Sequence, residues 1–187
     1  MALDASSITN FSATRPELEE LFLFWICAAG KNGTVATRLL DQFLQDIGGQ
    51  QEPFETIASL GYDSLVEALR NVGIGCYTRK AKTMFVAATS GLDLRRCTLE
   101  ELEAIPGIGP KTSRCFVLHS RPNTRVAALD THILKYLREQ GFDAPKSTPS
   151  SKKKYADLEK AFLSLADKAG VPVAEFDLAI WKQYAQR

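Results

Sequence analysis

A tight turn rich in glycine and proline, IPGIGPKT at positions 105–112, restricts the folds open to this chain more than any other stretch. The segment before it, TLEE at 98–101, is a capping box that predicts the start of a short helix. Pro110 suits the first position of a second helix, which we expect to reach about His119. The pattern therefore predicts helix, tight hairpin and helix, with Gly109 at a position that needs unusual backbone angles.

Helical periodicity extends over nearly the whole chain. Apolar residues recur at helical spacing in five further segments, 16–28, 35–47, 78–89, 158–169 and 176–184. The capping box SLVE at 64–67 predicts the start of another helix. RVAAL at 125–129 is the nearest approach to a strand pattern, and it fits an extended loop equally well. The sequence therefore predicts an all-α protein.

Basic residues gather in two parts of the chain, although the net charge of +1 does not itself indicate a polyanionic partner. Positions 104–129 contain no acidic residue but hold Lys111, Arg114, Arg121 and Arg125. The second group, interrupted only by Asp93, consists of Arg79, Lys80, Lys82, Arg95 and Arg96. Solvated helix faces are the ordinary explanation, but two basic groups around a glycine turn favour a polyanion as partner.

The four cysteines form no CxxC pair, which argues against a zinc or iron–sulfur site. The N-terminus lacks the basic-then-apolar pattern of a signal segment. The longest apolar run, at 21–29, is too short to span a bilayer. We therefore expect a cytoplasmic protein with reduced thiols, nucleoid-associated in a prokaryote, and no membrane partner.

The hairpin suggests an anion site. Glycines let the backbone N–H groups of Gly107, Gly109 and Lys111 approach a ligand closely, and a helix N-terminus favours negative charge. A DNA phosphate is the natural occupant, although an ordinary corner between two helices has the same pattern.

Lys111 and Asp130 are the candidate catalytic pair. The positive end of the helix dipole disfavours a charged amine at Lys111, burial acts in the same direction, and an uncharged lysine is a nucleophile. Asp130 opens the segment DTHILKYL, where plain N-capping is the more common role. The pair gains meaning only if the fold brings the two side chains together.

The combined pattern LEAIPGIGPKT…RVAALDTHI resembles the helix-hairpin-helix DNA glycosylases, the superfamily of endonuclease III and the 8-oxoguanine DNA glycosylases. Weaker similarity extends across FWICAAGKNGTVATRLL, NVGIGCYTRKAKTM and EFDLAIW, so most of the chain is covered. The resemblance implies two helical lobes with an active-site cleft between them. It also implies a monomer whose partner is double-stranded DNA containing a damaged base.

The resemblance assigns roles to the hairpin residues. Lys111 would attack C1′ of the damaged nucleotide, expel the base and leave a Schiff base, and β-elimination would then nick the strand. Asp130 would stabilise positive charge that develops at the sugar. Gly107, Ile108 and Gly109 match the hairpin that grips phosphate through backbone amides, often with a monovalent cation bound at backbone 105–109.

Two departures narrow the resemblance. Endonuclease III and many relatives carry a four-cysteine iron–sulfur motif near the C-terminus, but no cysteine follows Cys115 here, so we expect no such cluster and no other cofactor. The chain is also short, and we expect it to lack the extra N-terminal domain of the eukaryotic 8-oxoguanine enzymes. In both respects it is similar to the compact microbial 8-oxoguanine DNA glycosylases.

Candidates for the base pocket follow from the same resemblance. Cys115, one helical turn after Lys111, matches a cysteine that packs against the oxidised base, and His132 matches a histidine near the site. Most free cysteines are small buried hydrophobes, and core packing explains aromatic residues equally well. The opposite wall is expected from the last helix, which carries Phe176, Asp177 and Trp181.

Further DNA contacts are expected from one loop and from the predicted helix at 78–89. Lys31 and Asn32, in the loop AGKNG, lie where relatives carry the wedge that fills the gap left by the extruded base. Arg79, Lys80 and Lys82 would follow the DNA backbone and make binding salt-dependent. We expect residues 30–122 to form one lobe, which contains the helix-hairpin-helix at 98–120. Residues 1–29 and 123–187 would form the other lobe.

These features favour a base-excision-repair glycosylase with AP lyase activity, with 8-oxoguanine as the favoured base. A glycosylase for oxidised pyrimidines or mismatched bases remains an alternative. A DNA-binding module without chemistry is another, because a helix-hairpin-helix often serves only as a grip; Lys111 and Asp130 argue against it, since a grip needs neither. A helical scaffold that does not bind nucleic acid is the third.

Overall fold

The computed structural model describes residues 3–30 and 32–185, and within them every regular element is helical. The elements are η1 (Ala5–Ser7), α1 (Arg15–Ala28), α2 (Gly33–Asp46), α3 (Pro53–Leu60), α4 (Tyr62–Val72), α5 (Tyr77–Thr89), α6 (Leu99–Glu103), α7 (Pro110–Ser120), α8 (Thr131–Glu139), α9 (Lys152–Ala169) and α10 (Val173–Ala185). The segment 121–130 is an irregular connection, not a strand. The predicted all-α fold is confirmed.

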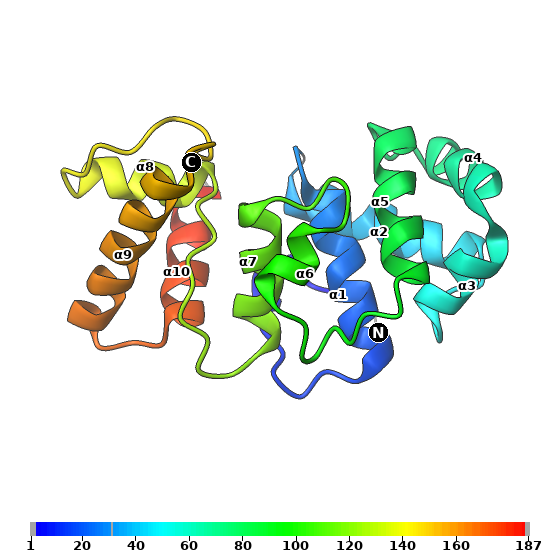
Figure 1. Ribbon diagram of the computed structural model, residues 1–187, viewed down its shortest axis with the longest axis horizontal. Helices are drawn as coiled ribbons and strands as arrows, with labels where there is room; N and C mark the ends of the chain where they lie inside the picture. The colour runs from blue at the N-terminus through cyan, green and yellow to red at the C-terminus, as the bar shows by residue number, and fades with distance from the viewer. Residues whose placement is uncertain (1–2, 31, 186–187) are drawn as a thin grey trace.

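The helices form two lobes around two hydrophobic cores (Figure 1). The first core gathers buried residues between Ile8 and Val117, from α1 to α7. The second core gathers buried residues between Leu118 and Tyr184, from the end of α7 and from α8, α9 and α10. The chain therefore passes from one lobe to the other within α7.

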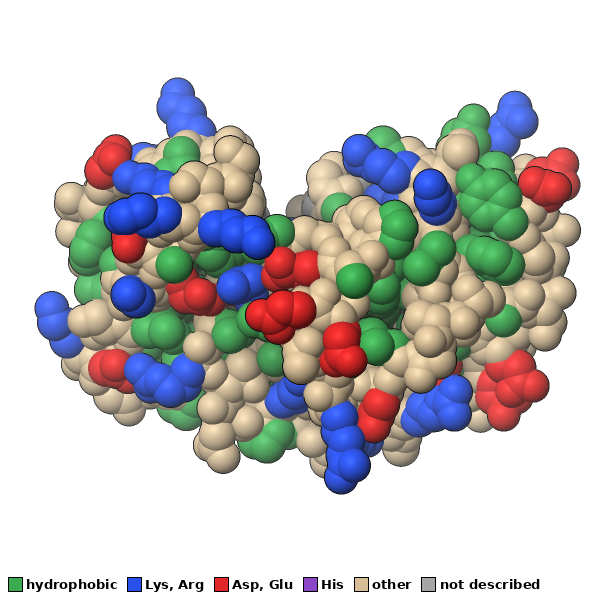
Figure 2. Space-filling view, in the orientation of Figure 1, with side chains coloured by type: hydrophobic (Ala, Val, Ile, Leu, Met, Phe, Trp, Pro, Cys, Tyr) green, Lys and Arg blue, Asp and Glu red, His purple; other side chains and the backbone are tan. Residues whose placement is uncertain are grey.

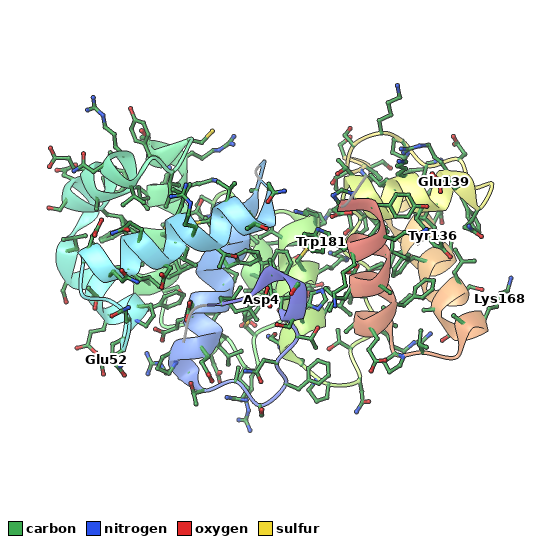
Figure 3. All side chains as sticks on the ribbon, turned by 180° about the vertical axis from the view of Figure 1, so that it is seen from behind. Asp4, Glu52, Tyr136, Glu139, Lys168 and Trp181 are labelled. Atoms are coloured by element: carbon green, nitrogen blue, oxygen red, sulfur yellow. The ribbon has the colours of Figure 1, made fainter. Side chains whose placement is uncertain are left out.

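The predicted assignment of residues 1–29 to the second lobe is wrong for α1. This helix is buried on nearly every side and packs against α2, α3, α5 and α7, so it lies at the centre of the first lobe. Its apolar residues extend all round, as is typical of a helix enclosed by others. Only the segment before it reaches toward the second lobe, where η1 with Asp4 faces Trp181 of α10 (Figure 3).

The hairpin between α6 and α7 depends on Gly107. This residue has φ +94°, and a Cβ there would lie 2.3 Å from Thr83 Oγ1, whose hydroxyl donates to the Pro106 carbonyl. Gly109 instead has φ −109° and ψ 178°, which is ordinary extended backbone, so the expected unusual angles at Gly109 are wrong. The helix pair itself and the capping box of Thr98 are as predicted.

The capping box predicted at 64–67 does not start a helix. The helix expected to begin at 64–67 begins earlier, at Tyr62 with Gly61 as N-cap, so Ser64 lies inside its first turn. Among the described helices, none is both long enough and apolar enough to cross a membrane.

Candidate active site

A cavity of about 560 Å³ lies between the two lobes. The space-filling view shows the molecule hollowed at the junction of the lobes (Figure 2). Residues from both lobes line the cavity, among them Ala5, Ile8, Phe24, Trp25, Asn32, Gly33, Lys111, Cys115, His119, Asp130, His132, Thr148, Asp177 and Trp181. This volume is in the range of small-molecule sites and accommodates one nucleoside.

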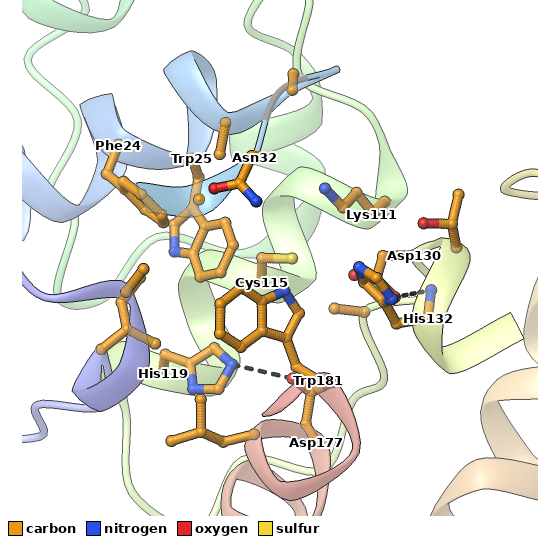
Figure 4. A pocket seen from close by; sticks show the side chains of 18 of the residues that line it. Phe24, Trp25, Asn32, Lys111, Cys115, His119, Asp130, His132, Asp177 and Trp181 are labelled. Atoms are coloured by element: carbon orange, nitrogen blue, oxygen red, sulfur yellow. Dashed lines mark hydrogen bonds and ion pairs between the residues drawn. The ribbon is translucent and has the colours of Figure 1, made fainter. Parts of the chain in front are cut away.

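The cavity brings Lys111 and Asp130 together (Figure 4). Lys111 is the second residue of α7 and is half-buried. Asp130 is the N-cap of α8, and its Oδ1 accepts the backbone N–H groups of His132 and Ile133, each at 2.8 Å. N-capping therefore fixes one oxygen of Asp130, while the same carboxyl group lines the cavity opposite the amine.

Burial dominates the electrostatics of Asp130. It raises the pKa of the carboxyl group above the ordinary value of 3.8, and the nearby carboxylate of Asp177 acts in the same direction. The N–H group of Ile133 and the charge of Lys111 oppose this rise. The cavity thus holds a carboxyl group that is more easily protonated than one in water.

Cys115 lies one turn after Lys111 on α7 and lines the same cavity. Burial raises the pKa of its thiol to about 12, although the nearby charge of Lys111 lowers it. The group is therefore a neutral thiol at physiological pH, which suits packing against a flat base and not nucleophilic attack.

Of the three residues expected on the opposite wall, Asp177 and Trp181 line the cavity, whereas Phe176 does not. Phe176 belongs to the second core, where its ring meets Tyr136 at 5.7 Å and Phe162 at 5.2 Å. Consecutive residues on a helix point about 100° apart, so Asp177 and Phe176 cannot share a face. Core packing is the role of Phe176.

Several residues that line the cavity escaped the sequence prediction, among them Trp25, His119 and Thr148. His119 Nε2 lies 3.3 Å from Asp177 Oδ2, and the imidazole ring stacks on Trp25 at 5.8 Å. Spacing on α7 carried a signal, because Lys111, Cys115 and His119 follow one another at intervals of four and share a helix face. Trp25 carried none, since it stands within an unbroken apolar run.

The backbone amides of the hairpin differ in whether they are already hydrogen-bonded within the turn. Ile108 donates its N–H to the Ile105 carbonyl at 3.0 Å and buries its side chain in the first core. Its amide is therefore committed to the turn, which is against the expected phosphate contact. Gly109 has open space around its Cα, and no backbone partner is recorded for its N–H among the described residues. The amides of Gly107, Gly109 and Lys111 remain the candidates for an anion.

The three residues of α5 predicted to contact DNA differ in how far they are buried. Arg79 and Lys82 are exposed. Lys80 is only 5% exposed, and its Nζ donates to the Cys27 carbonyl at 2.7 Å. A contact of Lys80 with the DNA backbone is therefore wrong, because the ammonium group joins α5 to the C-terminal end of α1. In the proposed wedge loop Asn32 lines the cavity, whereas Lys31 lies outside the described residues.

The four cysteines are free: Cys27 and Cys115 lie on α1 and α7, and Cys76 and Cys97 lie just before α5 and α6. Across the described parts of the chain, no cluster of three or more His, Cys, Asp or Glu side chains is placed to hold a metal ion.

A family model for the helix-hairpin-helix motif matches residues 92–118. The 8-oxoguanine DNA glycosylase/AP lyase of Methanocaldococcus jannaschii is 27% identical over 143 residues, which cover 71% of this chain and 68% of that protein. A protein of the same name from Metallosphaera sedula is 33% identical over 96 residues, covering 51% of this chain and 44% of that protein.

Solved structures of 8-oxoguanine DNA glycosylases share the fold of this chain. The 8-oxoguanine DNA glycosylase of Thermotoga maritima superposes with a TM-score of 0.75 at 21% identity, covering 95% of this chain and 85% of that one. The M. jannaschii glycosylase/lyase in complex with a 15mer DNA containing 8-oxoguanine gives 0.73 at 21% identity, covering 94% and 84%. The chain thus carries a helix-hairpin-helix motif within the fold of the archaeal and bacterial 8-oxoguanine DNA glycosylases.

Proposed function

We propose that this chain is a base-excision-repair DNA glycosylase with AP lyase activity, and that 8-oxoguanine in double-stranded DNA is its substrate. The observation that carries the proposal is the meeting of Lys111 and Asp130 in one cavity of nucleoside size, at the N-terminal end of the hairpin helix. The named relatives and the shared fold support the same activity.

The chemistry follows from the two side chains. The target nucleotide must leave the duplex, which costs a few kcal/mol and is easiest at a damaged pair. In the proposed step Nζ of Lys111 forms a bond to C1′ as the bond from C1′ to the base breaks, and the amine gives up a proton that the departing base takes up. The C1′–O4′ bond then breaks as the sugar ring opens, O4′ takes up a proton from solvent, and a Schiff base results. Removal of a proton from C2′ then expels the 3′ phosphate.

Asp130 has an electrostatic role in this scheme. Positive charge develops at the sugar as the bond to the base breaks, and an ionised carboxylate across the cavity stabilises it. N-capping holds that carboxylate in place before the substrate arrives, so little reorganisation is needed at the moment of reaction.

The phosphate grip is proposed for the amides of Gly107, Gly109 and Lys111, and a monovalent cation at backbone 105–109 remains a prediction. The carbonyls there fit a cation only in part, because Ile105 already accepts the N–H of Ile108 and Pro106 already accepts the Thr83 hydroxyl. No step of the chemistry depends on it.

A panel of lesion duplexes tests the substrate. We expect excision of 8-oxoguanine, tested opposite each of the four bases, to exceed excision of oxidised pyrimidines and of mismatched normal bases. A preference for either of those other classes would replace the substrate and keep the mechanism.

Borohydride reduction tests the chemistry. Reduction during incubation with lesion DNA should trap a covalent complex of the wild-type protein, and Lys111→Ala should abolish it. DNA binding without a trapped complex would leave only a helix-hairpin-helix grip. A trapped complex with Lys111→Ala would mean that another amine is the nucleophile.

A further inference from the structure

Lys111 and Asp130 approach the cavity from different elements, so their separation depends on whatever joins those elements. Lys111 stands at the start of α7, and Asp130 ends the irregular segment 121–130 that enters the second lobe. A polar cluster that joins α6, α7 and α9 contacts both places.

Arg114 is the first part of this cluster. It lies three residues after Lys111, and its Nε donates to Glu159 Oε1 of α9 at 2.9 Å. Its Nη1 donates to Glu103 Oε1 of α6, also at 2.9 Å, and the guanidinium lies 4.7 Å above the ring of Tyr155. The Arg114 side chain is only 16% exposed, so solvent screens these contacts weakly. The N-terminal half of α7 is therefore held to α9.

The same two residues of α9 hold the segment that leads to Asp130. Glu159 Oε1 also accepts the N–H of Ala127 at 2.8 Å. The hydroxyl of Tyr155 donates to the Ala127 carbonyl at 2.9 Å and accepts the N–H of Leu129 at 3.2 Å. That hydroxyl also lies 3.4 Å from the carbonyl of Pro110, the residue before Lys111. One carboxylate and one phenol thus contact both arms of the site.

We propose that Glu103, Arg114, Tyr155 and Glu159 form a clamp, called here the Arg114 clamp, that positions Lys111 relative to Asp130. This inference rests on the proposed function. The clamp residues lie outside the lining of the cavity and touch no substrate, so they are positioning residues. Displacement of a reacting group by about 1 Å can cost about 100-fold in rate, which gives a clamp of this kind a measurable effect.

Tyr155→Phe and Arg114→Gln test the clamp in the full-length protein. Tyr155→Phe removes one hydroxyl and keeps the ring beneath Arg114, so it disturbs the fold least. The matched control is Arg125→Gln, because Arg125 also pairs with a carboxylate of α9, Asp167 at 2.9 Å, but this pair is more than half exposed. The unfolding midpoint of each variant establishes that it is folded.

The readouts separate binding from chemistry. Single-turnover rates are measured on a duplex with 8-oxoguanine and on a duplex with a preformed abasic site. Affinity is measured with a duplex that carries a reduced, uncleavable abasic analogue. We expect both clamp variants to lower both rates by about 10- to 100-fold, with affinity within about twofold of wild type. Arg125→Gln should leave both rates unchanged, and Arg114→Lys, which keeps the charge, should recover part of the loss.

Two results would overturn the clamp alone. One is a wild-type protein that is active while both clamp variants react at its rate. The other is a parallel fall in rate and affinity, which indicates general loosening of the fold. Inactivity of the wild type on both duplexes would instead overturn the proposed function, and the clamp with it.

Discussion

The imidazole of His119 and the carboxylate of Asp177 form a buried pair at the cavity, with Nε2 3.3 Å from Oδ2. The other ring nitrogen lies 2.8 Å from the hydroxyl of Thr9, in the segment that precedes α1. A carboxylate accepts hydrogen bonds, so this geometry fits the tautomer in which Nε2 donates to Asp177. The remaining oxygen of Asp177, Oδ1, is buried and has no hydrogen-bond partner among the described residues.

The pair predicts a selective effect of substitution at His119. Under the proposed function Asp177 accepts an N–H of the extruded base, and His119 holds the carboxylate in place. Loss of a charged hydrogen bond costs about 1.5–3 kcal/mol, so His119→Leu should slow excision of 8-oxoguanine by about 10- to 100-fold. Nicking at a preformed abasic site should change little, because no base occupies the pocket there.

A matched variant controls for the lost volume. His119→Gln can place an N–H near the position of Nε2 and should recover much of the excision rate, whereas His119→Leu should not. Equal losses of excision and abasic-site nicking in His119→Leu would show that the histidine supports the whole cavity and not base recognition.

Local chemistry explains what could be predicted of the fold. The hairpin and the helix starting at Pro110 follow from residues that restrict their own backbone, so short-range pattern was enough. The lobe to which α1 belongs could not be predicted in this way, because it depends on which helices enclose α1. An apolar helix can be buried in either core. The helix that begins at Tyr62 starts before its apparent capping box because Gly61 serves as the N-cap.

The residues of the site likewise fall into those that a sequence motif could predict and those that only tertiary packing places. Lys111 and Asp130 were predicted because their spacing and residue types matched a known motif. Lys80 was misassigned because a lysine is usually exposed, and only the packing of α5 on α1 buries it. The pairing of His119 with Asp177 joins residues 58 positions apart, and no local pattern encodes such a contact.

The two hairpin glycines predict opposite consequences of substitution. Gly107→Ala must adopt φ +94° and meet Thr83, so we expect it to lower the free energy of unfolding by about 1–3 kcal/mol. Gly109→Ala has an ordinary backbone conformation and open space, so its stability should stay within about 0.5 kcal/mol of wild type.

DNA binding by Gly109→Ala should not follow its stability. The methyl group of Gly109→Ala stands beside the amides proposed to hold a phosphate, so DNA affinity should fall although the protein is stable. Chemical denaturation and a binding titration at fixed salt measure the two quantities. Unchanged affinity in Gly109→Ala would place the phosphate elsewhere on the molecule.

Substitutions of the basic residues on α5 should change either the salt dependence of DNA affinity or the stability of the fold. Arg79→Gln and Lys82→Gln should each reduce the slope of log affinity against log salt concentration by about 0.9, if each side chain contacts one phosphate of duplex DNA. Lys80→Met should leave that slope unchanged and lower the unfolding midpoint, because it removes the hydrogen bond to Cys27. A reduced slope in Lys80→Met would contradict the buried assignment.

Asp130→Asn separates activity from stability. Asparagine caps a helix as well as aspartate, so the bonds to His132 and Ile133 can persist while the charge is lost. We expect excision to fall by about 100-fold or more, because the charge that stabilises the sugar is absent. The wild-type rate should itself fall on acidification through the pKa of Asp130, which burial places above 3.8.

The stability of Asp130→Asn should change in the opposite direction. Because the pKa of Asp130 is raised on folding, the folded protein binds this proton more tightly than the unfolded chain, and ionisation at neutral pH costs stability. The variant should therefore unfold at or above the wild-type temperature at about pH 7. The difference should shrink as the pH falls through the raised pKa, where the wild-type carboxyl group is neutral. A variant less stable at about pH 7 would mean that the attraction of the carboxylate to Lys111 and to the helix N-terminus outweighs the cost of burying it.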